Sequence, residues 1–301
     1  MARLISLVED AAPELREVAA ALAAGGSLGQ ARVIGLTGAP GVGKSTSTAA
    51  LVRAYRDRGL RVGVLAVDPS SPFSGGALLG DRVRMQDHAT DREVFIRSMA
   101  TRGHLGGLAW AAPQAVRILD AAGCDVVLVE TVGVGQAEVE VASMADSTLV
   151  LVAPGMGDAI QAAKAGILEI ADVFVVNKAD RDGAQATIRD LRNMIALAEK
   201  RSGDAWKPPI VPTVAARGEG IEEVVAALDR HGEWLQRTGE LDRRRRARAA
   251  EEIEAMAVTA LRERIGDLRG STALATLADR VLAGELDPYA AADQLVGGLT
   301  G

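Results

Sequence analysis

Residues 38–45 have the spacing of a phosphate-binding loop. They read GAPGVGKS, and Gly38, Gly43, Lys44 and Ser45 fit the pattern G-x-x-x-x-G-K-[ST] between an apolar run and a helix-like segment. The glycines let consecutive backbone N–H groups point at phosphate oxygens, and the start of the following helix adds positive partial charge. Lys44 is expected to reach the β- and γ-phosphates, and Ser45 is expected to bind Mg²⁺. The residues predicted to line the phosphates are Gly38, Ala39, Pro40, Gly41, Val42, Gly43, Lys44, Ser45 and Thr46.

A second motif is typical of a site that reads guanine. Residues 177–180 read NKAD, which fits N-K-x-D at the end of an apolar run. The Asp180 carboxylate accepts hydrogen bonds only, so it can pair with the N1–H and 2-amino donors of guanine. Adenine lacks that pair of donors. Backbone N–H groups near Ala215 and Ala216 can reach the guanine O6, so GTP and GDP are the expected ligands. The residues predicted to bind the base are Asn177, Lys178, Asp180, Ala215, Ala216 and Arg217.

Three acids stand where a magnesium site is expected. Glu130 closes the apolar run CDVVLVE in the place of a D-x-x-G motif, so its carboxylate can hold a metal-bound water, and Gly133 can sense the γ-phosphate through its N–H. Asp68 and Asp81 supply two more hard oxygen donors. A turn-forming role at a strand end is the alternative for Asp68. The predicted metal set is Ser45, Asp68, Asp81 and Glu130.

The elements that must position these loops can be predicted from seven short apolar runs. They alternate with helix-like stretches, and this alternation predicts an α/β fold with a mostly parallel sheet and helices on both faces. Ligands of such sheets bind at the carboxyl ends of the strands. The predicted domains are an N-terminal helical extension (1–29), a phosphate-loop domain (30–235) and a C-terminal helical arm (236–301). The predicted strands are 33–37, 62–68, 94–98, 124–130, 147–154, 173–178 and 210–214.

Composition narrows the class of protein. The chain has 301 residues, 48% of them apolar, with a net charge of −6, one cysteine and three histidines. Acidity argues against nucleic acid as a partner, and the lone cysteine argues against a disulfide framework. No apolar run approaches the ~18 residues of a membrane span. The first residues lack the apolar core of a signal peptide, so a cytoplasmic protein is expected.

One basic segment opposes that acidity. Residues 243–248 read RRRRAR and run into a helical pattern in which Arg248 and Glu252 are four apart. The segment could form a patch that binds anions or nucleic acid. We favour the other interpretation, a helical face exposed to solvent.

Six segments form longer motifs: GAPGVGKST, VDPSSPFSGGALLGDRVRM, IRSMATRGHLGGLA, VETVGVGQAE, PGMGDAIQAAKAGILEIAD and NKAD. Together they resemble the MeaB/ArgK family of G proteins, which includes the MMAA type. The resemblance covers about residues 3–240 and implies homodimers with a C-terminal helical dimerisation arm. It also implies GTP-gated delivery of adenosylcobalamin to methylmalonyl-CoA mutase or a related acyl-CoA mutase, with 154–164 as an extra switch. The usual serine of the base loop is replaced by Ala215.

One catalytic group is missing from the motifs. Many GTPases carry a water-positioning glutamine directly after D-x-x-G, but here Val134 fills that place, so slow intrinsic hydrolysis is expected. The 154–164 segment spaces three polar side chains by three, which places them on one helical face. Our hypothesis is that a docking mutase presses this face toward the nucleotide, with Lys164 stabilising phosphoryl charge; a solvent-facing helix start is the alternative. The predicted catalytic set is Lys44, Glu130, Asp158, Gln161 and Lys164.

Two other functions fit parts of the pattern. A phosphate-loop kinase of a transport system matches the older ArgK label of the family, but a kinase has no need of a guanine-reading motif. A nickel-site metallochaperone GTPase uses related dimeric machinery, but such proteins usually carry tracts rich in His or Cys. The sequence lacks a cobalamin-binding D-x-H-x-x-G motif, so the cobalamin is expected to reside on the partner.

Overall fold

The computed structural model divides the chain into two compact units, Met1–Glu252 and Ile253–Gly301. The first unit holds the sheet and both predicted nucleotide motifs. The second contains helices α12 (Thr272–Leu282) and α13 (Pro288–Gly297), which pack against each other. The residues that the structure describes are 1–9, 12, 14–25, 29–68, 90–100, 107–131, 137–155, 169–198, 205–265 and 272–297.

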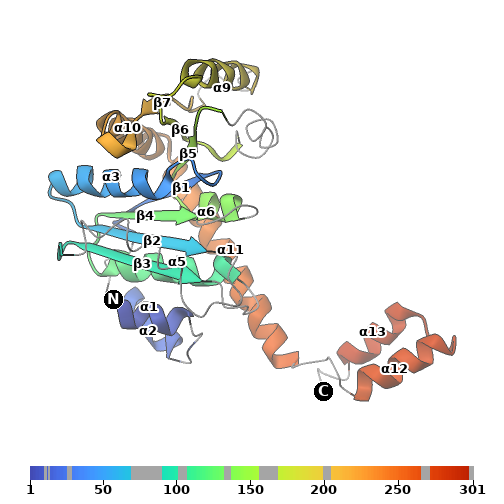
Figure 1. Ribbon diagram of the computed structural model, residues 1–301. Helices are drawn as coiled ribbons and strands as arrows, with labels where there is room; N and C mark the ends of the chain where they lie inside the picture. The colour runs from blue at the N-terminus through green and yellow to red at the C-terminus, as the bar shows by residue number, and fades with distance from the viewer. Residues whose placement is uncertain are drawn as a thin grey trace. The chain divides into compact units, whose positions relative to one another are not determined.

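A sheet of seven parallel strands forms the centre of the first unit (Figure 1). Its order is β3-β2-β4-β1-β5-β6-β7, so β1 lies in the middle between β4 and β5. Each predicted apolar run forms one strand, which confirms the predicted fold class. The loops that carry the motifs follow the carboxyl ends of β1, β4, β6 and β7. The strands are β1 (Arg32–Gly38), β2 (Val62–Asp68), β3 (Val94–Ala100), β4 (Val126–Thr131), β5 (Ser147–Val152), β6 (Val173–Asn177) and β7 (Ile210–Thr213).

Helices cover both faces of the sheet (Figure 1). Helices α3 (Lys44–Asp57) and α10 (Ile221–Thr238) pack on one face. Because side chains of a strand alternate between faces, Val126 and Leu128 of β4 lie against α3, whereas Val127 and Val129 face the other side. Glu130 continues the α3 side of this alternation. The helices of the opposite face are α1 (Ala2–Glu9), α5 (Gly107–Ala121), α6 (Ala137–Met144) and α9 (Ala184–Ala198), and α2 (Leu15–Ala24) packs beside α5.

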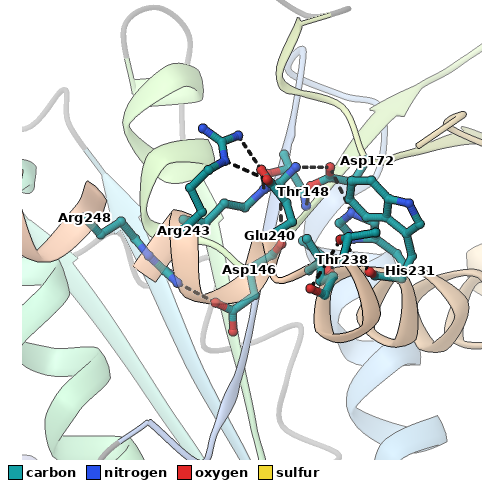
Figure 2. Close-up of polar contacts among 12 residues, drawn as sticks. Asp146, Thr148, Asp172, His231, Thr238, Glu240, Arg243 and Arg248 are labelled. Carbon is teal, nitrogen blue, oxygen red and sulfur yellow. Dashed lines mark hydrogen bonds and ion pairs between the residues drawn. The ribbon is translucent and has the colours of Figure 1, made fainter. Parts of the chain in front are cut away.

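The arginine run lies in α11 (Glu240–Ile265) and corrects one prediction. Arg244 donates two hydrogen bonds of 3.0 Å to Asp172, just before β6. Arg245 donates to Asp146, just before β5, at 2.8 Å. Arg248 donates to the same carboxylate (Figure 2). The Asp146 and Asp172 side chains are only 3% and 7% exposed. The prediction of a solvent-exposed face is therefore wrong for these three arginines, which neutralise carboxylates at the amino edge of the sheet.

Arg248 and Glu252, which are four apart in the predicted helix, both form hydrogen bonds with residues outside α11. Glu252 accepts hydrogen bonds from Gln114 and Arg117 of α5 rather than pairing along its own helix. Arg243 keeps the predicted exposure: it pairs with Glu240 at 2.6 Å and its side chain is 76% exposed (Figure 2). In this part of α11, one face therefore packs against the first unit and the other face is exposed to solvent. Within the described ranges, no helix is both long and apolar enough to cross a membrane.

Candidate nucleotide-binding site

The loop between β1 and α3 has the backbone that a phosphate cradle needs. Gly38 and Gly43 adopt φ angles of 144° and 96°, which favour glycine. A Cβ on Gly38 would lie 2.3 Å from the backbone oxygen of Leu151, and a Cβ on Gly43 would lie 2.4 Å from Nδ2 of Asn177. Both glycines are therefore required by conformation and by close contact with the neighbouring strands β5 and β6.

Lys44 begins α3 and folds back over this loop. Its ammonium donates hydrogen bonds to the carbonyl oxygens of Gly38 at 2.6 Å and Ala39 at 3.3 Å. The side chain is nearly buried, although the ammonium carries a full charge. The backbone carbonyls therefore hold a cation directly above the cradle, where it can meet phosphate oxygens.

Glu130 meets two hydroxyl groups of α3 at the end of β4. Ser45 Oγ donates to Glu130 Oε1 at 2.7 Å, and Thr48 Oγ1 donates to Oε2 at 2.8 Å. The glutamate is 1% exposed, so these hydrogen bonds help to offset the cost of burying the carboxylate. The structure therefore brings together two of the predicted metal-site residues. Thr48 was not predicted, although a threonine on the buried stripe of α3 was a signal that could have found it.

The other predicted metal-site residues are only partly described. Asp68 ends β2, whose Val67 pairs with Thr131 of β4, so its backbone lies at the same edge of the sheet as Glu130. Asp81 and Gly133 lie outside the described residues. Of the predicted catalytic group, Asp158, Gln161 and Lys164 also lie outside them, so their roles stay predictions.

Asn177 joins the base loop to the phosphate loop. Its Nδ2 donates to the Val42 carbonyl at 2.8 Å, and its Oδ1 accepts from the Ala215 N–H at 3.1 Å and the Thr213 hydroxyl at 3.2 Å. The next residue, Lys178, donates from Nζ to the Gly41 carbonyl at 2.6 Å. Two motifs about 130 residues apart in sequence are therefore bonded directly, with the carboxyl end of β6 between them.

Asp180 remains accessible to a ligand. Its side chain is 40% exposed, and Arg217 Nη1 approaches Oδ2 at 3.4 Å. Arg217 also donates from Nε to Glu219 at 2.7 Å. This hydrogen bond and the negative charges of Glu219 and Asp180 raise the pKa of the Arg217 guanidinium. Ala215, Ala216 and Arg217 form a single 3-10 turn, η3 (Ala215–Arg217), after β7. Of the predicted base-binding residues, Arg217 therefore approaches this accessible carboxylate directly.

Comparison with known proteins decides the family. A family model described as "Methylmalonyl Co-A mutase-associated GTPase MeaB" matches residues 1–268. The chain belongs to the MeaB family. MeaB proteins are GTPases, so this chain is a GTPase that binds guanine nucleotides, in agreement with the two loops described above.

Individual relatives agree with this assignment to the MeaB family. A Pyrococcus abyssi protein that carries the name of a GTPase is 47% identical over 296 residues, which cover 98% of this chain and 91% of the relative. The mouse mitochondrial methylmalonic aciduria type A homolog is 39% identical over 215 residues, covering 70% of this chain and 52% of that protein. The crystal structure of an LAO/AO transport system kinase matches with a TM-score of 0.72 and 29% identity, covering 100% of this chain and 92% of that one.

Proposed function

We propose that this MeaB-family protein is a magnesium-dependent GTPase switch that serves an adenosylcobalamin-dependent acyl-CoA mutase in the cytoplasm. In this proposal it acts as a homodimer, hydrolyses GTP slowly alone and faster with the mutase, and gates delivery of the cobalamin to methylmalonyl-CoA mutase or a close relative. The mutase part is supported by the description of the family. The nucleotide part is carried by one observation, the Asn177 side chain that bonds both nucleotide loops.

The residues at the end of β4 suit Mg²⁺. Ser45 and Glu130 offer hard oxygen atoms, which this ion prefers, beside the phosphate loop. Because the Ser45 hydroxyl donates its hydrogen to Glu130, a metal would be bound through the lone pairs of Oγ. Mg²⁺ would neutralise charge on the phosphates when bound. Lys44, held by the loop carbonyls, would add a second positive charge.

Nucleotide specificity tests the role of Asp180. GTP and GDP should bind far more tightly than ATP, because only a guanine-like edge offers two donors to the carboxylate. Asp180→Asn replaces an acceptor oxygen with a donor NH₂, so the variant should prefer xanthine nucleotides. Competition of each nucleotide against a fluorescent GDP measures both effects. Equal affinity of the unaltered protein for ATP and GTP would refute the assignment.

A Mg²⁺ titration separates the roles of Lys44 and Ser45. Lys44→Ala should weaken nucleotide binding at every Mg²⁺ concentration, because the lost charge acts on the phosphates directly. Ser45→Ala should be partly rescued by added Mg²⁺, because the lost oxygen acts through the metal. Identical titration curves for the two variants would contradict these roles.

Partner stimulation tests the mutase part of the proposal. Single-turnover GTP hydrolysis should accelerate when a methylmalonyl-CoA mutase is added. Lys164→Ala should keep the basal rate and the GTP affinity but lose the acceleration. A cation supplied to the transferring phosphoryl group can raise the hydrolysis rate ~10³-fold or more. Full acceleration of the variant would return Lys164 to a surface role. No acceleration of the unaltered protein by any acyl-CoA mutase would remove the partner from the proposal.

The kinase alternative has support from the name of one solved relative, the LAO/AO transport system kinase. A kinase transfers the γ-phosphoryl group to an acceptor, whereas a GTPase transfers it to water. Release of inorganic phosphate from GTP in the absence of any acceptor protein therefore distinguishes the two. Dependence of that release on a transport protein that becomes phosphorylated would favour the kinase.

A further inference from the structure

Thr48 lies one turn after Ser45 on the face of α3 that packs against the sheet. It shares this face with Leu51 and Val52, which are buried against β4. Its side chain is fully buried, yet it carries a hydroxyl group on an otherwise apolar stripe. The hydroxyl meets Glu130 Oε2 at 2.8 Å. A buried polar group of this kind needs a partner, and here the partner is the carboxylate beside the phosphate loop.

A threonine inside a helix often donates to the carbonyl four residues earlier. Thr48 Oγ1 does lie 3.1 Å from the Lys44 carbonyl oxygen. The hydroxyl has a single hydrogen, so it can donate fully to only one of the two acceptors. The carboxylate oxygen is closer and carries negative charge, which makes its hydrogen bond the stronger. Thr48 therefore donates to Glu130.

We propose that Thr48 is a positioning residue that fixes the Glu130 carboxylate and, through it, the Ser45 oxygen that faces Mg²⁺. This inference rests on the proposed magnesium-dependent function. Ser45 and Thr48 hold the two oxygens of Glu130 separately, at 2.7 Å and 2.8 Å, so the plane of the carboxylate is set by one rigid helix. With the Thr48 hydroxyl removed, Oε2 loses its hydrogen bond to α3, and the carboxylate is less restrained against rotation about its side-chain bonds.

Rotation of Glu130 would change what Ser45 offers to the metal. While Glu130 Oε1 accepts the Ser45 hydrogen, the lone pairs of Ser45 Oγ are directed away from the carboxylate. A rotated carboxylate no longer fixes that direction. The backbone of Glu130 stays in place, because Glu130 pairs with Leu36 of β1 on one side and with Ala66 of β2 on the other. Thr48 therefore controls a side-chain orientation and leaves the strand unchanged.

The test is the Mg²⁺ dependence of GDP release. Fluorescent GDP is bound to the purified protein, chased with unlabelled GDP, and the release rate is measured from excess EDTA to millimolar Mg²⁺. Loss of a hydrogen bond to a metal ligand typically costs 10- to 100-fold in metal affinity. Thr48→Val should therefore raise the Mg²⁺ concentration that half-maximally slows release by that factor. Its release rate in EDTA should match that of the unaltered protein.

Two variants separate positioning from packing. Thr48→Ser keeps the hydroxyl and should restore the Mg²⁺ dependence. Ser47→Ala removes a neighbouring buried hydroxyl, for which the described part of the chain shows no hydrogen-bond partner, and should leave the dependence unchanged. Urea unfolding shows whether Thr48→Val is folded. If it is not, Thr48→Ala is used instead, because it removes the same hydroxyl with a smaller side chain.

Each other outcome overturns the assignment. A normal Mg²⁺ dependence in Thr48→Val would show that Thr48 does not position Glu130. Equal impairment of the Ser and Val variants would show that the effect does not come from the hydroxyl, because Thr48→Ser keeps it. Faster release in EDTA would place Thr48 in nucleotide binding itself. Release that ignores Mg²⁺ in the unaltered protein would overturn both this assignment and the magnesium-dependent function.

Discussion

His231 of α10 should make the stability of this protein depend on pH. The imidazole is fully buried, with Nδ1 at 2.8 Å from the Ser147 hydroxyl and its ring centroid 4.8 Å from that of Trp206 and 5.7 Å from that of Trp234. Burial lowers the pKa of His231 to about 4, and the nearby Asp172 carboxylate only partly opposes this shift. The folded protein therefore keeps the ring neutral under ordinary conditions.

The sign and size of the effect follow from linkage. An unfolded histidine titrates near pH 6.5, so below that pH the unfolded chain takes up a proton that the folded chain refuses. The stability is full above pH 6.5 and falls as the pH drops toward the folded pKa of about 4. A difference of this size lowers the free energy of unfolding by about 2 kcal/mol from pH 7.5 to pH 5.

Other charged groups lie near the ring, and their contributions to the pH dependence must be distinguished from that of His231. Arg244 of α11 and Arg32 of β1 lower the pKa of His231 further, whereas Asp146 raises it. Burial alone would raise the pKa of Asp146, but bonds from Arg245 and the charge of Arg248 lower it, so its own contribution to stability is lost only at more acidic pH.

Urea unfolding of the unaltered protein and of His231→Gln, at pH 7.5 and pH 5, measures this contribution. The glutamine cannot take up a proton, so the loss between the two pH values should be about 2 kcal/mol smaller in the variant. Equal losses in the two proteins would refute the assignment of the effect to His231. A larger loss in the variant would reverse the sign of the reasoning.

Three further substitutions test the charge network and the nucleotide loops. Arg244→Ala should cost about 3 kcal/mol of unfolding free energy, because buried Asp172 loses both hydrogen bonds from the arginine and keeps the one from the Thr148 N–H. Exposed Arg243→Ala should cost less than about 0.5 kcal/mol, and equal costs in urea unfolding would contradict this. Gly43→Ala places a Cβ 2.4 Å from Asn177 Nδ2 and should weaken GDP binding in a fluorescence titration, where unchanged affinity would refute the clash. Asn177→Ala leaves backbone groups of both loops unpaired and should lower stability by about 1–3 kcal/mol, and a thermodynamically neutral variant would show that the loops are held by other contacts.

The strands and motif loops could be predicted from the sequence because their signals are local. Parallel strands that are buried on both faces read as continuous apolar runs, and each of the seven runs became a strand. Phosphate binding is encoded in the spacing of Gly38, Gly43 and Lys44 within eight residues. The order of the strands is not local, and it places β1 between β4 and β5. This order alone brings Glu130 beside α3.

The contacts that the sequence did not reveal join residues far apart in the chain. Arg244 reaches Asp172 across 72 positions and Arg248 reaches Asp146 across 102, so a helical pattern in residues 243–252 could not show that these cations have partners. The amide of Asn177 was predicted as part of a base-reading motif, but its bond to Val42 of the phosphate loop depends on how two strands lie in the sheet.

The arginines of α11 also decide where this protein can be shortened or fused. A chain cut between α10 and α11 would lose the guanidinium groups of Arg244, Arg245 and Arg248 and would leave Asp146 and Asp172 without these cations. Removing one partner of a buried ion pair typically costs about 3–5 kcal/mol, which is a large part of the stability of an ordinary domain. Tags, fusion partners and protease sites are therefore better placed after this helix, which ends at Ile265.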